Sequence, residues 1–261
     1  MSGTPQPLPS LSAVLGLKPG DMAAVMGAGG KATLMKRLVR ELLDAGTPVI
    51  VTSTTNLHGL GAEEGVSLLL SGEGRDRVRE AAAAWAARGP VVWVEKKLPQ
   101  NMFRGLPPAQ VEALHAQRFG GVLVVKTDGA RKRLVKAPGK GEPVIPRGAT
   151  HCLVVLGLSA IGQRAEPGIV HRGERVAALT GLRLGDVIAP AHLAALASHP
   201  ESYPSRLPPG SWRVLYLSHC TDAERLRLAG EVWRGVPRGR YDLLVAGDTA
   251  EGNFYVQGEN A

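Results

Sequence analysis

The stretch Val25-Met26-Gly27-Ala28-Gly29-Gly30-Lys31-Ala32-Thr33 lies between an apolar run and an amphipathic segment. Three glycines within four residues let the backbone turn tightly and direct several N–H groups toward one point. A helix that begins there adds the positive end of its dipole. Lys31 brings a charge to the outer phosphates of a ligand, and Thr33 brings a hydroxyl. The stretch therefore predicts a phosphate site of the strand–loop–helix type. The alternative is an ordinary glycine-rich turn with a solvated lysine.

The stretch departs from the full phosphate-loop signature at two positions. Val25 stands where the signature has its first glycine, and Ala32 stands where it has a metal-binding serine or threonine. We therefore expect ligand binding to depend little on Mg²⁺, and we expect slow ATP hydrolysis.

The residues around this stretch predict an α/β fold. Leu34, Leu38 and Leu42 recur every four residues, which is typical of an amphipathic helix, and Ala45-Gly46 ends it. A β-rich run follows at residues 47–53. Strand, helix and strand in about 30 residues indicate a right-handed crossover and a parallel sheet.

The same alternation continues along the chain. Strands are expected at 91–94, 121–125, 152–156, 212–217 and 241–246, and helices at 11–17, 75–87, 174–180, 189–198, after Pro107-Pro108 and after a capping box at Thr221-x-x-Glu224. The expected fold is a mostly parallel sheet with helices on both faces, similar to phosphate-loop NTPases, with a small helical annex. We expect a disordered leader at 1–10 and a single domain at 11–261. Within that domain we expect a hairpin excursion near 131–146, the annex near 160–210 and a polar tail from 247.

Polar residues follow two of the expected strands, where ligands of parallel sheets bind. Thr54 and Thr55 follow the run at 47–53, and Lys126 and Asp128 follow the run at 121–125. Hydroxyls can hold phosphate or water, although threonine is also a common strand residue. Asp128 is a candidate metal ligand and, with Lys31, a candidate catalytic residue. The alternative is a simple Asp-Gly turn.

The charge of the chain is compatible with anionic ligands. Lys and Arg number 31 against 23 acidic residues, for a net charge of +8, and the densest basic run is 126–140, which includes Arg131. This run is an anion site or a solvated rim. It contains no aromatic residues, so a nucleic-acid surface is not expected. His171 is a further candidate binding residue, with a capping or surface role as the alternative.

Neither a secretory signal nor an apolar window long enough to span a bilayer is found in the sequence. Cys152 and Cys220 lie in or beside apolar runs without metal-ligand spacing, which favours buried, reduced, unpaired thiols. We therefore expect a cytoplasmic protein.

Several motifs in this order resemble the YqeC-like family, accessory proteins of selenium-dependent molybdenum hydroxylases, over about residues 15–247. The motifs are Gly-Ala-Gly-Gly-Lys-Ala-Thr-Leu-Met (27–35), Thr-Ser-Thr-Thr-Asn (52–56), Thr-Asp-Gly-Ala-Arg (127–131), Lys-Ala-Pro (136–138), Glu-Pro-Val-Ile-Pro (142–146), Gly-Leu-Ser-Ala-Ile-Gly (157–162), Val-His-Arg (170–172) and His-Pro-Glu (199–201). The resemblance implies binding of ATP or a related nucleotide through Gly27, Ala28, Gly29, Gly30, Lys31, Ala32 and Thr33. It also implies a role in maturing such a hydroxylase or its cofactor intermediate.

This chain departs from the family pattern at four places. Where the family has Lys-Thr-Thr, this chain has Ala32 as the middle residue, and where the family has a threonine run that ends in His, it has Asn56. Where the family has Glu-Ala-Asp-Gly, this chain begins the segment with Lys126. An Asn-Lys-x-Asp-like segment of the family is replaced by Ser218-His219-Cys220-Thr221. We expect Lys126 to enter the site and stand in for a metal ion. The alternative is that Lys126 points away from the crevice and that Thr33 and Asp128 support ordinary turnover. The leading hypothesis is an accessory factor with weak or no hydrolysis. The alternatives are an active ATP-dependent transferase or ligase and a structural chaperone.

Overall fold

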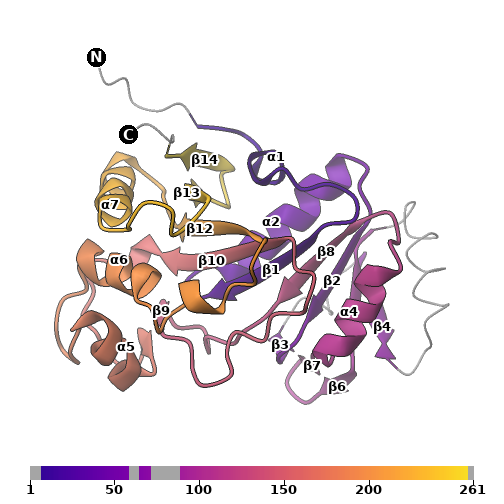
Figure 1. Ribbon diagram of the computed structural model, residues 1–261, viewed down its shortest axis with the longest axis horizontal. Coiled ribbons are helices and arrows are strands. Elements are labelled where there is room, and N and C mark those ends of the chain that lie inside the picture. Colours follow the sequence, from indigo (N-terminus) through magenta and orange to yellow (C-terminus); the bar gives the residue numbers. More distant parts are fainter. Residues whose placement is uncertain (1–6, 59–64, 72–88, 258–261) are drawn as a thin grey trace.

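A central sheet of mixed direction organises the computed structural model, which describes residues 7–58, 65–71 and 89–257 (Figure 1). Within these ranges the sheet has nine strands, in the order β14 (Asn253–Val256), β13 (Leu243–Asp248), β12 (Trp212–Ser218), β10 (His151–Gly157), β1 (Met22–Gly27), β8 (Val122–Lys126), β2 (Val49–Ser53), β5 (Val91–Val94) and β4 (Ser67–Leu70). All neighbours are parallel except β13 and β14. The predicted α/β class is confirmed.

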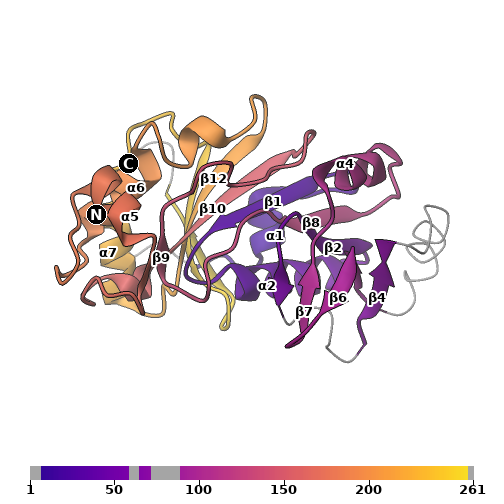
Figure 2. The same ribbon diagram turned by 90° about the horizontal axis from the view of Figure 1, so that it is seen from below.

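Helices cover both faces of this sheet. They are α1 (Leu11–Leu15), α2 (Lys31–Asp44), α4 (Pro108–Ala116), α5 (Gly173–Thr180), α6 (Pro190–Ser198) and α7 (Ala223–Arg234), with short 3₁₀ turns η2 (Leu158–Ala160) and η3 (Pro204–Arg206). The β1–α2–β2 crossover and the β5–α4–β8 connection move in opposite directions along the sheet. Right-handed connections therefore place α2 and α4 on opposite faces, as Figure 2 shows. The predicted helical annex contains α5 and α6, and α6 also contacts α7.

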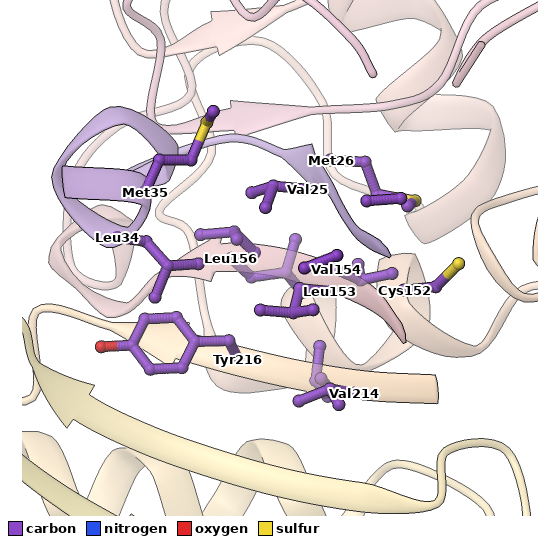
Figure 3. Close-up of a cluster of buried hydrophobic side chains, with 14 of the residues drawn as sticks. Val25, Met26, Leu34, Met35, Cys152, Leu153, Val154, Leu156, Val214 and Tyr216 are labelled. Carbon is purple, nitrogen blue, oxygen red and sulfur yellow. The ribbon is translucent and has the colours of Figure 1, made fainter. Parts of the chain in front are cut away.

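The core lies around the two middle strands of the sheet. Every residue of β1 and β10 is buried, as expected of parallel strands covered on both faces. Leu34 and Met35 of α2 join this cluster, together with Val214 and Tyr216 of β12 (Figure 3). Cys152 and Cys220 are free and buried, as predicted. Burial raises the pKa of Cys152 to about 11.

Two smaller sheets lie outside the central one. One has the order β3 (Leu57–His58), β7 (Met102–Arg104) and β6 (Lys96–Leu98), and the other pairs β9 (Val135–Lys136) with β11 (Val170–His171) in parallel. The predicted hairpin at 131–146 is therefore wrong, because the strand in that segment takes its partner from residues 170–171 rather than from within the segment.

Two further predictions need correction. The polar tail expected from 247 contains β14, which pairs with β13 because Phe254 is fully buried against the sheet. The predicted capping box at Thr221 and Glu224 is wrong, because the N-cap is the next residue along the chain. Asp222 is the N-cap of α7, and its carboxylate accepts a hydrogen bond from the Arg225 amide at 2.7 Å.

Parts of some predictions lie outside the described residues. The whole of the helix expected at 75–87 and residues 1–6 of the expected disordered leader lie outside them. The described end of the leader is ordered, because Leu8 forms an antiparallel bridge with Phe254 and Ser10 caps α1. Of the helices that the structure describes, none has the length and apolar character needed to cross a membrane.

Candidate functional site

The glycine loop, residues 27–30, joins β1 to α2 at the carboxyl edge of the sheet. Gly27, Gly29 and Gly30 have φ values of 100°, 69° and 125°. Residues other than glycine rarely adopt this backbone conformation. Gly30 is the N-cap of α2, which runs for 14 residues. The first N–H groups of a helix have no partner within it. The loop and the first turn of α2 therefore have the strand–loop–helix arrangement predicted from the sequence, and anion binding there stays a prediction.

Close contacts with neighbouring strands explain the glycines. A Cβ atom on Gly27 would lie 2.1 Å from the carbonyl oxygen of Val155, and one on Gly29 would lie 2.8 Å from Cα of Gly157. A Cβ atom on Gly30 would lie 2.8 Å from Oγ of Ser218. The loop is therefore wedged against the ends of β10 and β12.

Lys31 is folded back over the loop. Its side chain is only 7% exposed, and its ammonium lies 3.0 Å from Oδ1 of Asp128 and also donates to the carbonyl oxygen of Gly27. Burial lowers the pKa of Lys31, and Asp128 opposes that effect. The lysine is thus held at the loop by the carboxylate of Asp128 and by the carbonyl oxygen of Gly27.

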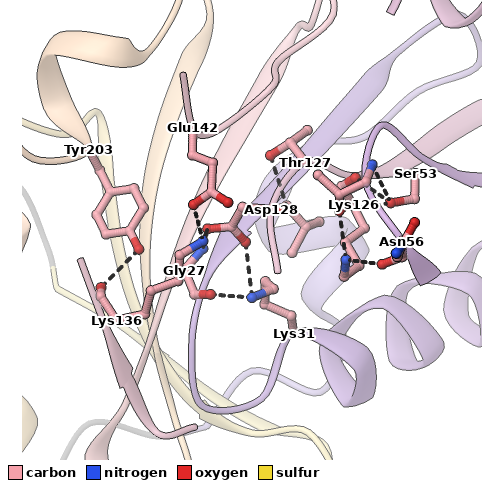
Figure 4. A network of polar contacts seen from close by, with 12 residues as sticks. Gly27, Lys31, Ser53, Asn56, Lys126, Thr127, Asp128, Lys136, Glu142 and Tyr203 are labelled. Atoms are coloured by element: carbon pink, nitrogen blue, oxygen red, sulfur yellow. Dashed lines mark hydrogen bonds and ion pairs between the residues drawn. The ribbon is translucent and has the colours of Figure 1, made fainter. Parts of the chain in front are cut away.

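Asp128 links the loop to a second lysine (Figure 4). The carboxylate is fully buried just beyond β8, and Oδ2 accepts hydrogen bonds from the Gly27 amide at 3.1 Å and from the Lys136 ammonium at 2.7 Å. Burial raises the pKa of Asp128, but Lys31 and Lys136 outweigh it and hold the pKa below its ordinary value. The carboxylate therefore stays ionised as a shared counter-ion.

Lys136 belongs to a chain of ion pairs that the sequence did not predict. Its fully buried ammonium lies 2.8 Å from Oε2 of Glu142, and Arg172 binds both oxygens of Glu142 at 2.6 and 3.0 Å. The buried Tyr203 hydroxyl donates to the carbonyl oxygen of Lys136 at 3.0 Å. Lys136, Glu142 and Arg172 lie in motifs of the family resemblance, and that is the signal that could have identified them.

Lys126 takes a different place from the one expected. Its ammonium donates to Thr55 Oγ1 at 2.8 Å and to the carbonyl oxygen of Asn56 at 2.7 Å, on the β2 side of the site. Burial lowers the pKa of Lys126 to about 8, and the charge of Lys31 adds to the decrease. Thr54 donates to the carbonyl oxygen of Val144 at 2.6 Å. Thr55 and Lys126 thus pair with each other, and it is Lys136 that contacts Asp128.

The remaining predicted residues lie around this network. Ala32 and Thr33 are exposed on the first turn of α2, and Arg131 is exposed with a φ of 49°. His171, on β11, has a pKa lowered by burial and by Arg172 and Lys136. Among the described residues there is no group of three His, Cys, Asp or Glu side chains that could hold a metal ion. A metal-binding role for Asp128 stays a prediction.

A second set of side chains borders the loop on its other side. Ser218 Oγ donates to the carbonyl oxygen of Gly29, and His219 Nδ1 lies 2.9 Å from Ser159 Oγ. His219 has a φ of 60°, and burial lowers its pKa. The sequence identified Ser218 and His219 only as a departure from the family pattern, but they help to fix the position of the loop.

Comparisons with known proteins agree with the family resemblance. A family model described as "YqeC protein" matches residues 23–174, more than half of the chain. The chain is 26% identical over 228 residues to a protein of Escherichia coli (strain K12) described as "Uncharacterized protein YqeC", covering 87% of each. Among solved structures it is similar to chloroplast FtsY from Physcomitrella patens, with a TM-score of 0.44 and 14% sequence identity. The aligned region covers 94% of this chain and 64% of the FtsY chain. Because the family model matches more than half of the chain, including the glycine loop, we conclude that this chain belongs to the YqeC family.

Proposed function

We propose that this chain binds an ATP-like nucleotide or another phosphate ligand at residues 27–33. The observation that carries the proposal is the glycine loop at the start of α2, with the ammonium of Lys31 held directly beside it. Phosphate oxygens would accept hydrogen bonds from the first N–H groups of the helix and from Lys31.

The arrangement favours binding over turnover. Phosphoryl transfer depends on a divalent ion that bridges phosphate oxygens, anchored by a hydroxyl beside the loop lysine and by a nearby carboxylate. Here Ala32 has no hydroxyl, and the carboxylate of Asp128 already binds two ammonium groups. We therefore propose weak or no intrinsic hydrolysis. A phosphate-release assay that shows rapid, Mg²⁺-dependent ATP hydrolysis would favour the transferase or ligase alternative.

The direct test is calorimetric titration with ATP, ADP and pyrophosphate. Lys31→Ala should weaken binding by about 1.5 to 3 kcal/mol, the range for a hydrogen bond to a charged group, or roughly 10- to 150-fold in Kd. Arg40→Ala, at an exposed position on the same helix, is the control and should bind like the wild type. Equal affinity of the Lys31 variant and the wild type would refute the site.

We further propose that the protein acts in the cytoplasm as an accessory factor in the maturation of a selenium-dependent molybdenum hydroxylase. This role is supported by YqeC family membership together with the association that the family resemblance implies. In a host that makes such a hydroxylase, deletion of the gene should lower the selenium and molybdenum content of the purified hydroxylase. Restoration by the wild type but not by Lys31→Ala would link maturation to the loop, and an unchanged metal content would refute the role.

A further inference from the structure

The ion-pair chain beside the glycine loop alternates in sign. It runs from Lys31 to Asp128, Lys136, Glu142 and Arg172, so that three cations share two carboxylates. The side chains of Asp128 and Lys136 are 0% exposed. An unpaired charge at that depth is strongly destabilising. Asp128 and Lys136 therefore need charged partners, whereas Glu142 and Arg172 are partly exposed.

Lys136 lies where two carboxylates converge. Its ammonium is 2.7 Å from Oδ2 of Asp128 and 2.8 Å from Oε2 of Glu142. Oxygen ligands lie 2.0–2.1 Å from Mg²⁺ and 2.3–2.6 Å from Ca²⁺. A divalent cation at the same point would thus need the two oxygens to approach by about 0.1–0.5 Å for Ca²⁺ and by about 0.6–0.8 Å for Mg²⁺.

The ammonium of Lys136 weakens the hold of Asp128 on Lys31, with which a bound phosphate would also pair. Asp128 uses Oδ1 for Lys31 and Oδ2 for Lys136, so that its single negative charge is divided between two cations. Lys31 keeps part of its positive charge for a ligand. In metal-dependent phosphate sites, a divalent cation commonly provides this neutralisation of carboxylates.

We propose that Lys136 is an internal substitute for a divalent cation, and that it makes the glycine loop a site for metal-free phosphate. This inference rests on the proposed phosphate binding, but its central claim concerns Lys136 and the two carboxylates. Lys136 acts through Asp128 and is a positioning residue. It neutralises Asp128 and Glu142 and leaves the ammonium of Lys31 available to phosphate.

Lys136→Met tests the substitution, because it removes the cation that the buried carboxylate of Asp128 and the partly exposed carboxylate of Glu142 share. The variant should acquire a binding site for Mn²⁺ or Mg²⁺ that the wild type lacks, measured by calorimetry and by the electron paramagnetic resonance signal of Mn²⁺. Addition of Mn²⁺ should also raise its Tm and leave that of the wild type unchanged. Lys126→Met is the control, since Lys126 is partly buried near the same site but binds Thr55 and Asn56 instead of a carboxylate. It should gain no metal site.

Pyrophosphate binding provides the second readout. The wild type should bind pyrophosphate within about twofold equally in EDTA and in Mg²⁺. Lys136→Met should lose at least tenfold in affinity in EDTA and regain it when Mg²⁺ is added. If the wild type needs Mg²⁺ to bind pyrophosphate, the inference is overturned whether or not the variant folds. So would a folded Lys136→Met protein that takes up no metal.

The two proposals fail in different ways. If the wild type binds no phosphate in either condition, the proposed function is wrong, but metal uptake by Lys136→Met still decides whether Lys136 occupies a cation position. If the wild type binds pyrophosphate through Lys31 and Lys136→Met behaves like the wild type in both readouts, only the present inference is wrong.

Discussion

Asp128 determines which lysines belong to the candidate site. Its two oxygens bind Lys31 and Lys136, while Lys126, only two residues before it, donates to Thr55. Lys126 is predicted as the extra cation because it stands where the resembling family has Glu. In the structure Lys126 ends β8 next to the end of β2, so the loop after β2 offers the nearer oxygen atoms.

Glu142 gives a prediction about pH. Burial raises its pKa, but hydrogen bonds from Arg172 and Lys136 outweigh it and lower the pKa from 4.5 to about 2. A lowered carboxyl pKa stabilises the fold above the unfolded-state value, and this stability is lost as the pH falls toward the folded-state value. With allowance for partial solvent screening, Glu142→Gln should cost about 1 to 2 kcal/mol at pH 7.

Urea unfolding at several pH values checks this prediction. The difference between the wild type and Glu142→Gln should be constant from pH 7 to about pH 5 and should shrink as the pH falls from 4.5 toward 2. Glu251→Gln, at an exposed position beside the edge strand β14, is the control. A stability difference that persists undiminished at pH 2.5 would contradict the assignment.

Among the secondary-structure elements, the glycine loop and α2 together set the position of the candidate site. Local sequence is sufficient to predict this unit, because closely spaced glycines and a periodic apolar stripe act within one turn or one helix. The position of the loop depends on β10 and β12, whose ends approach it from segments more than 100 residues downstream.

Gly27→Ala tests that close approach. The added Cβ would lie 2.1 Å from a backbone oxygen of β10, at a φ of +100°. We expect a loss of about 3 kcal/mol or more in the free energy of unfolding, from backbone strain and overpacking together. Gly46→Ala, also at positive φ but with nothing within 4 Å, should lose only about 1 kcal/mol. Similar losses for the two variants, measured by urea denaturation, would contradict the wedged loop.

At the scale of the whole molecule, the two described ends of the chain meet at one edge of the sheet. Leu8 bridges Phe254 of β14, and the guanidinium carbon of Arg37 on α2 lies 5.5 Å from the centre of the Phe254 ring. Phe254 is fully buried. The last strand is thus tied to the helix that begins at the glycine loop. A single domain over 11–261 remains our prediction.

Phe254→Ala should destabilise the whole fold. Removing a fully buried phenylalanine typically costs 3 to 5 kcal/mol through lost burial and the cavity left behind, so a loss of about that size is expected here. Phe254→Leu, which keeps most of the volume, should cost less than about 2 kcal/mol. Thermal unfolding of both variants measures the difference. A loss below about 1 kcal/mol for Phe254→Ala would show that β14 does not stabilise the sheet.

The sequence by itself determined the α/β class, the strand–loop–helix unit at 22–44 and the burial of both cysteines. These features follow from local periodicity, glycine spacing and apolar runs, which act over one element at a time. The tertiary structure alone decided that β9 pairs with β11, that Phe254 adds a strand to the sheet, and that Lys136, Glu142 and Arg172 join Asp128. Strands of two residues carry no detectable period, and an ion pair between distant segments leaves no local pattern. Their partners are therefore set only when the sheet brings the chain segments together.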